Sequence, residues 1–129
     1  MGSVILHLIP AADYHALAAD ADVTAPSLAI DGFIHCTDDP AVLLQVANAF
    51  YRHLDGPFVA LRIDVDALSS RCVWEAPAHL AGGDGAPPLA PSFPHIYGPI
   101  DRNAVVGVVG VSRSDDGSFT GYEGEPDRI

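Results

Sequence analysis

Three of the six histidines lie inside short apolar segments that read as strands. They are His7 (in ILHLI), His35 (in DGFIHCT) and His95 (in FPHIYG). A buried imidazole needs a hydrogen-bond partner, so three of them in separate strands need three partners. If the strands converge, they predict a polar pocket in an apolar wall. The alternative for each ring is a structural bond to a backbone carbonyl, which is the commoner role of a lone histidine in a core.

The segment DGFIHCT, residues 31–37, begins with a turn and ends at a helix cap. On a strand, Phe33 and His35 share one face, while Ile34 and Cys36 share the other. Phe33 and His35 are therefore expected to form part of a pocket wall. Cys36 is expected to be a small apolar residue of the core.

Two more residues can supply chemistry beside these histidines. Glu75 follows Trp74 directly, and a carboxylate packed on an indole has a raised pKa and can act as an acid or base. The alternative is that Glu75 points to solvent from an edge strand while Trp74 packs inward. Tyr97 follows His95 by two residues and shares its face, where its ring can stack on a planar ligand or cap the core.

The same side chains predict neither a metal nor a nucleophilic cysteine. None of His7, His35, His95 and Glu75 has the local spacing of a zinc site, so no metal is expected. Cys36 adjoins His35, and neighbours on a strand point to opposite faces, which argues against a cysteine–histidine nucleophile pair.

Composition restricts the partners and the compartment. The 129 residues carry a net charge of −11, and all six basic residues are arginines. Nucleic acids and anionic membranes are therefore not expected as partners, because both require clustered basic groups. A small-molecule ligand remains, since one or two arginines suffice even for an anion. The two cysteines form no disulfide framework and no signal segment is recognisable, so we expect a reducing cytoplasm.

The order of periodic segments predicts one α+β domain over residues 1–129, with a curved, mainly antiparallel sheet and two helices packed on it. One helix is expected over residues 11–20, after Pro10, and the other over residues 40–54, capped by Asp39. Strands are expected in residues 4–9, 58–65, 72–76, 93–97 and 105–111, and a short strand of three or four residues is expected within 31–37. Apolar and polar residues alternate in residues 58–65, which predicts a half-buried strand.

Three segments are expected outside this core. The sequence from 23 to 29 reads as a loop, and residues 82–91 are rich in glycine and proline, which predicts a mobile lid at the pocket mouth. A hairpin turn is expected at residues 115–118, and residues 119–129 read as a weak strand followed by a polar tail.

In this order and at these intervals, the segments ILHLI, DGFIHCT, VWE and FPHIYGP resemble a bacterial family of small proteins. That family is catalogued as domain of unknown function number nine hundred and fifty-two, and the resemblance covers about residues 4–113. The family has no settled activity. It is grouped by fold with the ADP-ribosyltransferase-like proteins, which split NAD at the nicotinamide bond. The resemblance therefore implies a split, mainly antiparallel sheet and NAD as the candidate cofactor.

Within that fold group the chain looks most like the RNA 2′-phosphotransferase, which has one histidine in a first strand and a second in a His-Val-His-Leu-Ser type strand. His7 resembles the first, His35 resembles the second, and Thr37 stands at the small hydroxyl position. The resemblance implies that His7 contacts the nicotinamide-side ribose and that either a tyrosine or the second histidine, His35, packs by the nicotinamide. Glu75 is the candidate for the late catalytic glutamate. The basic surface of the RNA enzyme is absent, and the net charge of −11 argues against RNA.

Three functions follow from these observations. The first is an enzyme that binds NAD or a related nucleotide and transfers or hydrolyses its ADP-ribose group. The second is an enzyme that performs acid–base chemistry on a small metabolite without NAD, and the third is a binding domain without catalysis. In the first, the catalytic residues are expected to be His35, Glu75 and His7, and the ligand-binding residues His95, Tyr97, Phe33 and Thr37.

Overall fold

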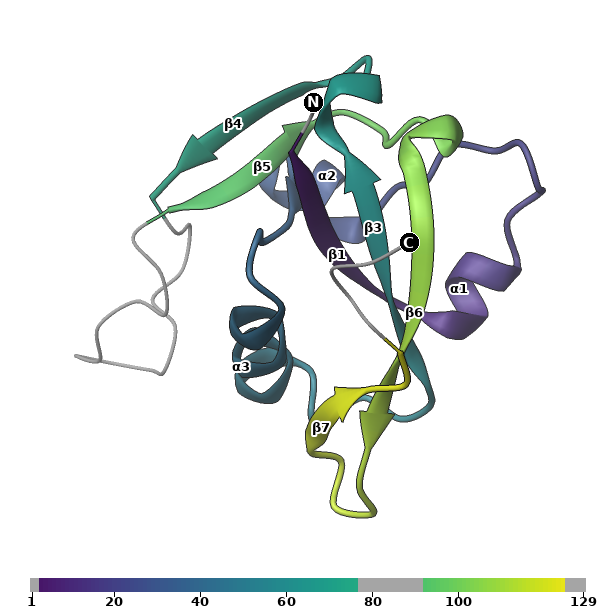
Figure 1. Cartoon of the computed structure of the whole chain (residues 1–129), viewed down its shortest axis with the longest axis vertical. Helices are drawn as coiled ribbons and strands as arrows, with labels where there is room; N and C mark the ends of the chain where they lie inside the picture. Colours follow the sequence, from purple (N-terminus) through teal and green to yellow (C-terminus); the bar gives the residue numbers. More distant parts are fainter. Residues whose placement is uncertain (1–2, 77–91, 125–129) are drawn as a thin grey trace.

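The computed structural model describes residues 3–76 and 92–124, which form three α-helices and seven strands (Figure 1). The helices are α1 (Ala11–His15), α2 (Pro26–Asp31) and α3 (Pro40–Phe50). The strands are β1 (Val4–Pro10), β2 (Ile34–His35), β3 (Phe58–Asp64), β4 (Arg71–Glu75), β5 (Phe93–Tyr97), β6 (Val105–Arg113) and β7 (Phe119–Tyr122). Two short 3₁₀ turns are η1 (Val65–Ala67) and η2 (Arg102–Ala104). The predicted α+β class is confirmed.

The described strands pair only in antiparallel fashion and form two sheets, as predicted for a curved and divided sheet. One has the strand order β1-β3-β6-β7 and the other β2-β5-β4. Figure 1 shows the β4–β5 pair turning away from the four-stranded sheet. The sheets are linked where Leu6 and Thr37 exchange backbone hydrogen bonds of 2.7 and 2.9 Å. This link places the segment of His35 beside the strand of His7.

The central strand β3 is buried on both faces, so the prediction of a half-buried strand is wrong. Val59, Leu61 and Ile63 pack in a core cluster shared with β2 and β5. Phe58 and Ala60 pack in a second cluster shared with α3, β6 and β7. The reason is tertiary packing, since one face of β3 joins the cluster with β2 and β5 and the other joins the cluster with α3 and β7.

Helix α3 begins as predicted and ends earlier. The side chain of Asp39 accepts a hydrogen bond of 2.9 Å from the backbone N–H of Ala41, and Pro40 occupies the first helical position. The helix was predicted to reach residue 54 but ends at Phe50, after which Leu54 closes a turn by bonding to the carbonyl of Tyr51. Among the described residues no helix is long and apolar enough to cross a membrane.

The predicted helix over residues 11–20 is wrong beyond His15, where α1 ends. A tertiary contact explains this end: the Arg102 guanidinium donates hydrogen bonds of 3.1 Å to the carbonyls of Ala18 and Ala21. Two carbonyls are thereby satisfied without helical pairing. These contacts join residues about 80 positions apart, which local helix propensity does not register.

The segment from 23 to 29 was expected to be a loop, and most of it is helical. Helix α2 begins with Pro26 at its first position and ends at Asp31, and it is followed by Gly32, whose φ of +88° lies in the left-handed region. The described residues therefore form three helices where two were predicted. The shortness of α2, six residues, hides its periodicity in the sequence.

The predicted hairpin turn joins β6 to β7. Ser114 donates a backbone hydrogen bond of 2.9 Å to Ser118, and Gly117 has φ +90°. The predicted weak strand is β7, which ends at Tyr122. The predicted lid at residues 82–91 and the end of the tail at residues 125–129 lie outside the described residues.

Two glycines with almost equal φ provide a matched test of this turn. Gly56 has φ +95° and open space where a Cβ would lie, whereas a Cβ on Gly117 would lie 2.6 Å from the Arg52 carbonyl oxygen. Gly56→Ala should cost roughly 1–2 kcal/mol, the price of a left-handed alanine. Gly117→Ala should cost roughly 1–3 kcal/mol more, because the Arg52 backbone must move. Urea unfolding of both variants measures the difference, and equal losses would mean that the turn accommodates the methyl group.

Candidate functional site

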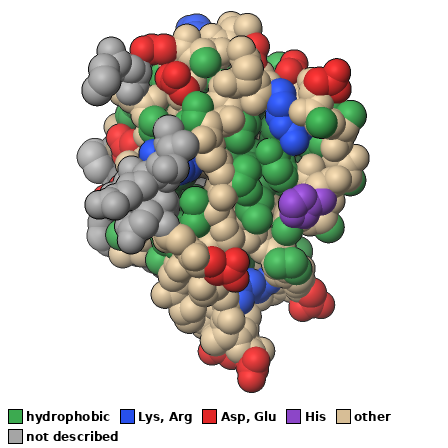
Figure 2. Space-filling view, turned by 45° about the vertical axis from the view of Figure 1, so that its right-hand side comes forward, with side chains coloured by type: hydrophobic (Ala, Val, Ile, Leu, Met, Phe, Trp, Pro, Cys, Tyr) green, Lys and Arg blue, Asp and Glu red, His purple; other side chains and the backbone are tan. Residues whose placement is uncertain are grey.

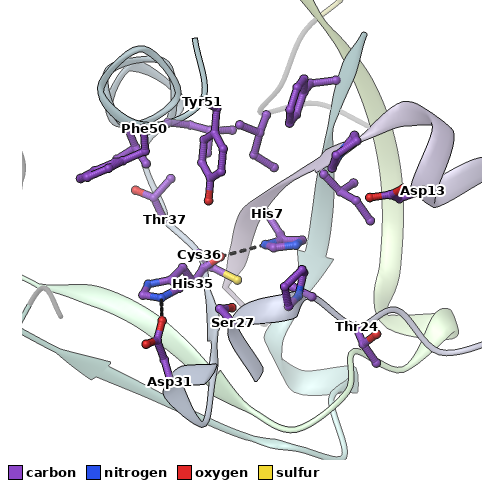
Figure 3. Close-up of a pocket in the computed structure, with 18 of the residues that line it drawn as sticks. His7, Asp13, Thr24, Ser27, Asp31, His35, Cys36, Thr37, Phe50 and Tyr51 are labelled. Atoms are coloured by element: carbon purple, nitrogen blue, oxygen red, sulfur yellow. Dashed lines mark hydrogen bonds and ion pairs between the residues drawn. The ribbon is translucent and has the colours of Figure 1, made fainter. Parts of the chain in front are cut away.

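The structure brings His7, His35 and His95 to one cleft, together with Thr37. The cleft has a volume of about 800 Å³, which suits a ligand of nucleoside size or larger. Figure 3 shows His7 and His35 approaching the same space from β1 and from the segment that begins with β2. The polar residues that line the cleft are His7, Asp13, Thr24, Ser27, Asp31, His35, Thr37, Tyr51 and His95. Geometry thus supports the predicted grouping of the histidines, and their functional roles stay predictions.

His7 is buried and held in one tautomer. Its Nδ1 lies 2.8 Å from the backbone carbonyl oxygen of His35, and because a carbonyl only accepts, Nδ1 carries the proton and donates it. Burial lowers the pKa of His7 from 6.5 to about 4, since the charged ring would lose its hydration, and the bond to the carbonyl offsets only part of this effect. At neutral pH the ring is uncharged, and its Nε2 carries a lone pair.

His35 forms a pair with Asp31. The distance between His35 Nε2 and Asp31 Oδ2 is 2.9 Å, and the two side chains are 35 % and 25 % exposed. Asp31 is the last residue of α2, and the positive φ of Gly32 turns the chain so that this carboxylate reaches the strand that follows. A carboxylate that orients an imidazole beside a cleft is an arrangement capable of acid–base chemistry.

His95 lies between the cleft and a second polar group. On β5 it pairs with His35 of β2 on one side and with Val73 of β4 on the other. Its Nδ1 lies 2.9 Å from Oε1 of Glu75, and the ring of Phe33 stacks on it at 4.0 Å with an interplanar angle of 20°. The side chain is only 2 % exposed, and its Nε2 has no hydrogen-bond partner in the described part of the chain.

Glu75 and Tyr97 lie behind His95, outside the set of described residues that line the cleft. The Tyr97 hydroxyl donates to the same Oε1 of Glu75 that His95 contacts. The pKa of Glu75 is lowered, first by the hydrogen bond from Tyr97 and then by that from His95. The expected raised pKa is therefore wrong. Trp74, the neighbour on which that expectation rested, is 40 % exposed, and its Nε1 contacts Asp38 Oδ2 at 3.4 Å.

Phe33 and Cys36 occupy the two faces that the alternation of the strand predicted. The Phe33 ring lies 4.8 Å from that of His35 and 5.4 Å from that of Tyr97, so it packs among the site residues. It is not among the described lining residues of the cleft. Cys36 is 5 % exposed, and burial first, followed by the nearby Cys72, raises the pKa of its thiol. Cys36 is a buried thiol and a poor nucleophile, as expected.

The charge of the cleft is negative. Its described lining includes the carboxylates of Asp13 and Asp31 and no arginine. This agrees with the net charge of −11, and Figure 2 shows acidic side chains at several places on one face of the molecule and few basic ones. Within the described ranges, no group of three or more His, Cys, Asp or Glu side chains is arranged to hold a metal ion.

Comparison with known proteins places the chain in a family. Residues 8–108 match the model of a family described as "Protein of unknown function (DUF952)". The chain belongs to the DUF952 family. The resemblance drawn from the histidine segments is thereby confirmed at the level of the family. The matched residues include His35 and His95. No curated protein matches the sequence.

The crystal structure of another protein has the same fold as this DUF952 protein. It is protein CC0527 from Caulobacter crescentus, with a TM-score of 0.67 and 25 % sequence identity over 91 % of this chain and 93 % of that chain. A double mutant of CC0527 gives a TM-score of 0.66 and 24 % identity over the same shares. The likeness spans nearly the whole of both chains, so the α+β fold described above is that of the solved protein.

The structure also adds residues of the DUF952 cleft that sequence reasoning missed. Tyr51 follows the last residue of α3, and Figure 3 shows its hydroxyl pointing into the space between Thr37 and His7. Burial raises the pKa of Tyr51, so it stays a neutral phenol. Asp31 was interpreted only as part of a turn, although an aspartate four residues before a histidine and directly before a glycine was a usable signal.

Proposed function

We propose that the cleft binds the nucleoside end of NAD, or of a related nucleotide, and that the protein is an enzyme of ADP-ribosyltransferase-like type that transfers or hydrolyses the ADP-ribose group. The observation that carries the proposal is the neutral His7, whose Nδ1 is fixed on the His35 carbonyl beside the Asp31–His35 pair. A fixed imidazole lone pair is suited to accept a hydrogen bond from a ribose hydroxyl. The resemblance to the ADP-ribosyltransferase-like fold group is a second argument for this proposal.

The charge of the cleft suits one end of NAD better than the other. The nicotinamide ring of NAD is cationic, and the described lining contains two carboxylates and no arginine. The anionic diphosphate is therefore proposed to lie toward the open side of the cleft, away from Asp13 and Asp31. Apolar side chains such as Phe93 and Phe50 supply surfaces for a planar ring.

The same groups support cleavage of the nicotinamide bond. The bond between the anomeric carbon and the pyridinium nitrogen breaks, and its electrons leave with neutral nicotinamide. A water molecule or another hydroxyl attacks that carbon and gives its proton to the Asp31–His35 pair. Carboxylates stabilise the positive charge that develops on the ribose ring. Glu75, predicted as catalytic, is proposed to act only through His95, to which it is bonded.

A thermal-shift assay tests the proposal directly. With NAD at 1 mM and a dissociation constant near 10 μM, binding should stabilise the protein by roughly 2.7 kcal/mol. ADP-ribose, which lacks the nicotinamide ring, should stabilise it less, and chromatography should detect nicotinamide released from NAD. Stabilisation by none of NAD, nicotinamide and adenosine, together with no release of nicotinamide, would contradict the proposal.

One observation favours a second candidate, an enzyme that performs acid–base chemistry without NAD. The Asp31–His35 contact of 2.9 Å requires no nucleotide and could activate water toward a small neutral or cationic metabolite. The ligands of the thermal-shift assay distinguish the two candidate functions. The second predicts stabilisation by small amines or amides and no effect of NAD.

A further inference from the structure

His95 presents a buried nitrogen that no described residue satisfies. Its side chain is 2 % exposed and lines the cleft, and Nε2 has no partner among residues 3–76 and 92–124. A buried polar atom left without a hydrogen bond costs roughly 1–3 kcal/mol. Since His95 also borders a cleft large enough for a ligand, the unsatisfied nitrogen marks a position where a ligand atom is expected.

Glu75 decides which kind of ligand atom that is. Oε1 of Glu75 accepts from the Tyr97 hydroxyl and lies 2.9 Å from His95 Nδ1. An ionised carboxylate is acceptor-only, so His95 Nδ1 must carry a proton. In the neutral ring Nε2 then has a lone pair and accepts. Phe33, stacked on the ring at 4.0 Å, fixes its plane.

The rest of the described lining has the same character. His7 also keeps a lone pair on Nε2, because its Nδ1 donates to the His35 carbonyl. Asp13 and Asp31 are carboxylates, and the hydroxyl residues of the lining can donate or accept. Among the described lining residues none is a lysine or arginine. The cleft is therefore rich in acceptors and negative charge.

We infer that His95 is a specificity-determining residue that accepts a hydrogen bond from an N–H group on the base of the ligand. The ligand class is a planar base that carries a primary amide or an exocyclic amine and no negative charge. Glu75 is the positioning residue that sets the tautomer of His95. This inference rests on the proposed function, since it assumes that the cleft holds a nucleoside, and it extends that function by naming what the site distinguishes.

Matched ligand pairs test the inference by calorimetry on the full chain. The pairs are nicotinamide riboside with nicotinic acid riboside, adenosine with purine riboside, and benzamide with benzoate. In each pair the first member has the N–H donor and the second lacks it. We expect at least about tenfold tighter binding of the donor, equivalent to roughly 1.4 kcal/mol. In His95→Phe, which keeps a ring against Phe33, the preference for adenosine over purine riboside, which are both neutral, should fall toward unity. In His53→Phe, at an exposed position, it should not change.

The outcomes separate the inference from the proposed function. Nucleosides that bind without preference for the donor overturn the inference and leave the proposed function standing. Binding of benzamide and of no nucleoside overturns both, because the inference assumes that the cleft holds a nucleoside. A cleft that binds none of the six compounds overturns both.

A spectroscopic measurement keeps the inference testable if His95→Phe does not fold. Nitrogen-15 NMR of the wild-type protein should show the proton of His95 on Nδ1 and none on Nε2. Glu75→Leu should give a mixture of the two tautomers, which a merely structural Glu75 would not produce. A proton found on Nε2 in the wild-type protein overturns the inference.

Discussion

Lowering the pH from 7 to 4 should remove roughly 3 kcal/mol of stability through His7 alone. The pKa of His7 falls from 6.5 to about 4 on folding because the ring is buried. Below pH 6.5 the unfolded chain therefore binds a proton that the folded chain does not, and stability is lost as the pH falls toward 4. The difference between a pKa of 6.5 and one of about 4 corresponds to roughly 3 kcal/mol. Urea unfolding at several pH values between 7 and 4 measures the loss.

A glutamine at position 7 provides the control for this effect. The amide of His7→Gln can still donate to the His35 carbonyl, which His7 Nδ1 contacts at 2.8 Å, but it does not titrate. Carboxylates contribute to the acid response of both proteins, so the difference between the two slopes isolates His7. The wild-type protein should lose more stability than the variant by about the amount above. Equal slopes would show that His7 titrates in the folded protein as it does in water.

The parts of the fold that follow from short-range rules could be predicted from the sequence. The cap at Asp39 and the proline after it fixed the start of α3. Alternation along one strand was enough to place Phe33 with His35 and to place Cys36 in the core. These predictions depend on residues one to four positions apart, where backbone geometry alone decides which side chains are neighbours.

The parts that depend on tertiary contacts could not be predicted. The early end of α1 reflects carbonyls that Arg102 satisfies from a distant turn. The lowered pKa of Glu75 reflects hydrogen bonds from Tyr97 and His95, about 20 residues away in the sequence. Such partners are set by the register of β4 against β5, which the sequence does not reveal.

The candidate site divides in the same way. That His7, His35 and His95 converge was predictable, because each is a polar residue inside an apolar strand. The sequence did not predict that Glu75 and Tyr97 bond to each other behind His95. All three residues lie on the same sheet, and only the directions of their side chains decide which of them line the cleft. Asp31 was missed because it is the last residue of α2, a helix too short to be recognised in the sequence.

Removal of the His35 side chain should abolish ligand binding and leave the fold nearly intact. The side chain is 35 % exposed, and its bond to Asp31 joins two partly exposed groups, so loss of that bond should cost roughly 1 kcal/mol or less. The backbone carbonyl that accepts from His7 remains in His35→Ala. We expect a melting temperature within about 5 °C of wild type and no NAD binding detectable by calorimetry. Both are measured on the same samples, by thermal shift and calorimetry.

The same substitution at His95 provides the contrast. His95 is 2 % exposed, stacks on Phe33 and is bonded to Glu75, so His95→Ala should lower stability by roughly 2–4 kcal/mol. Truncation of His35 removes a ligand contact, whereas truncation of His95 removes a ligand contact and part of the core. If His35→Ala instead lowers the melting temperature as far as His95→Ala and leaves ligand affinity unchanged, His35 has a structural role. The proposed enzyme would then be replaced by a binding domain whose ligand does not depend on the Asp31–His35 pair.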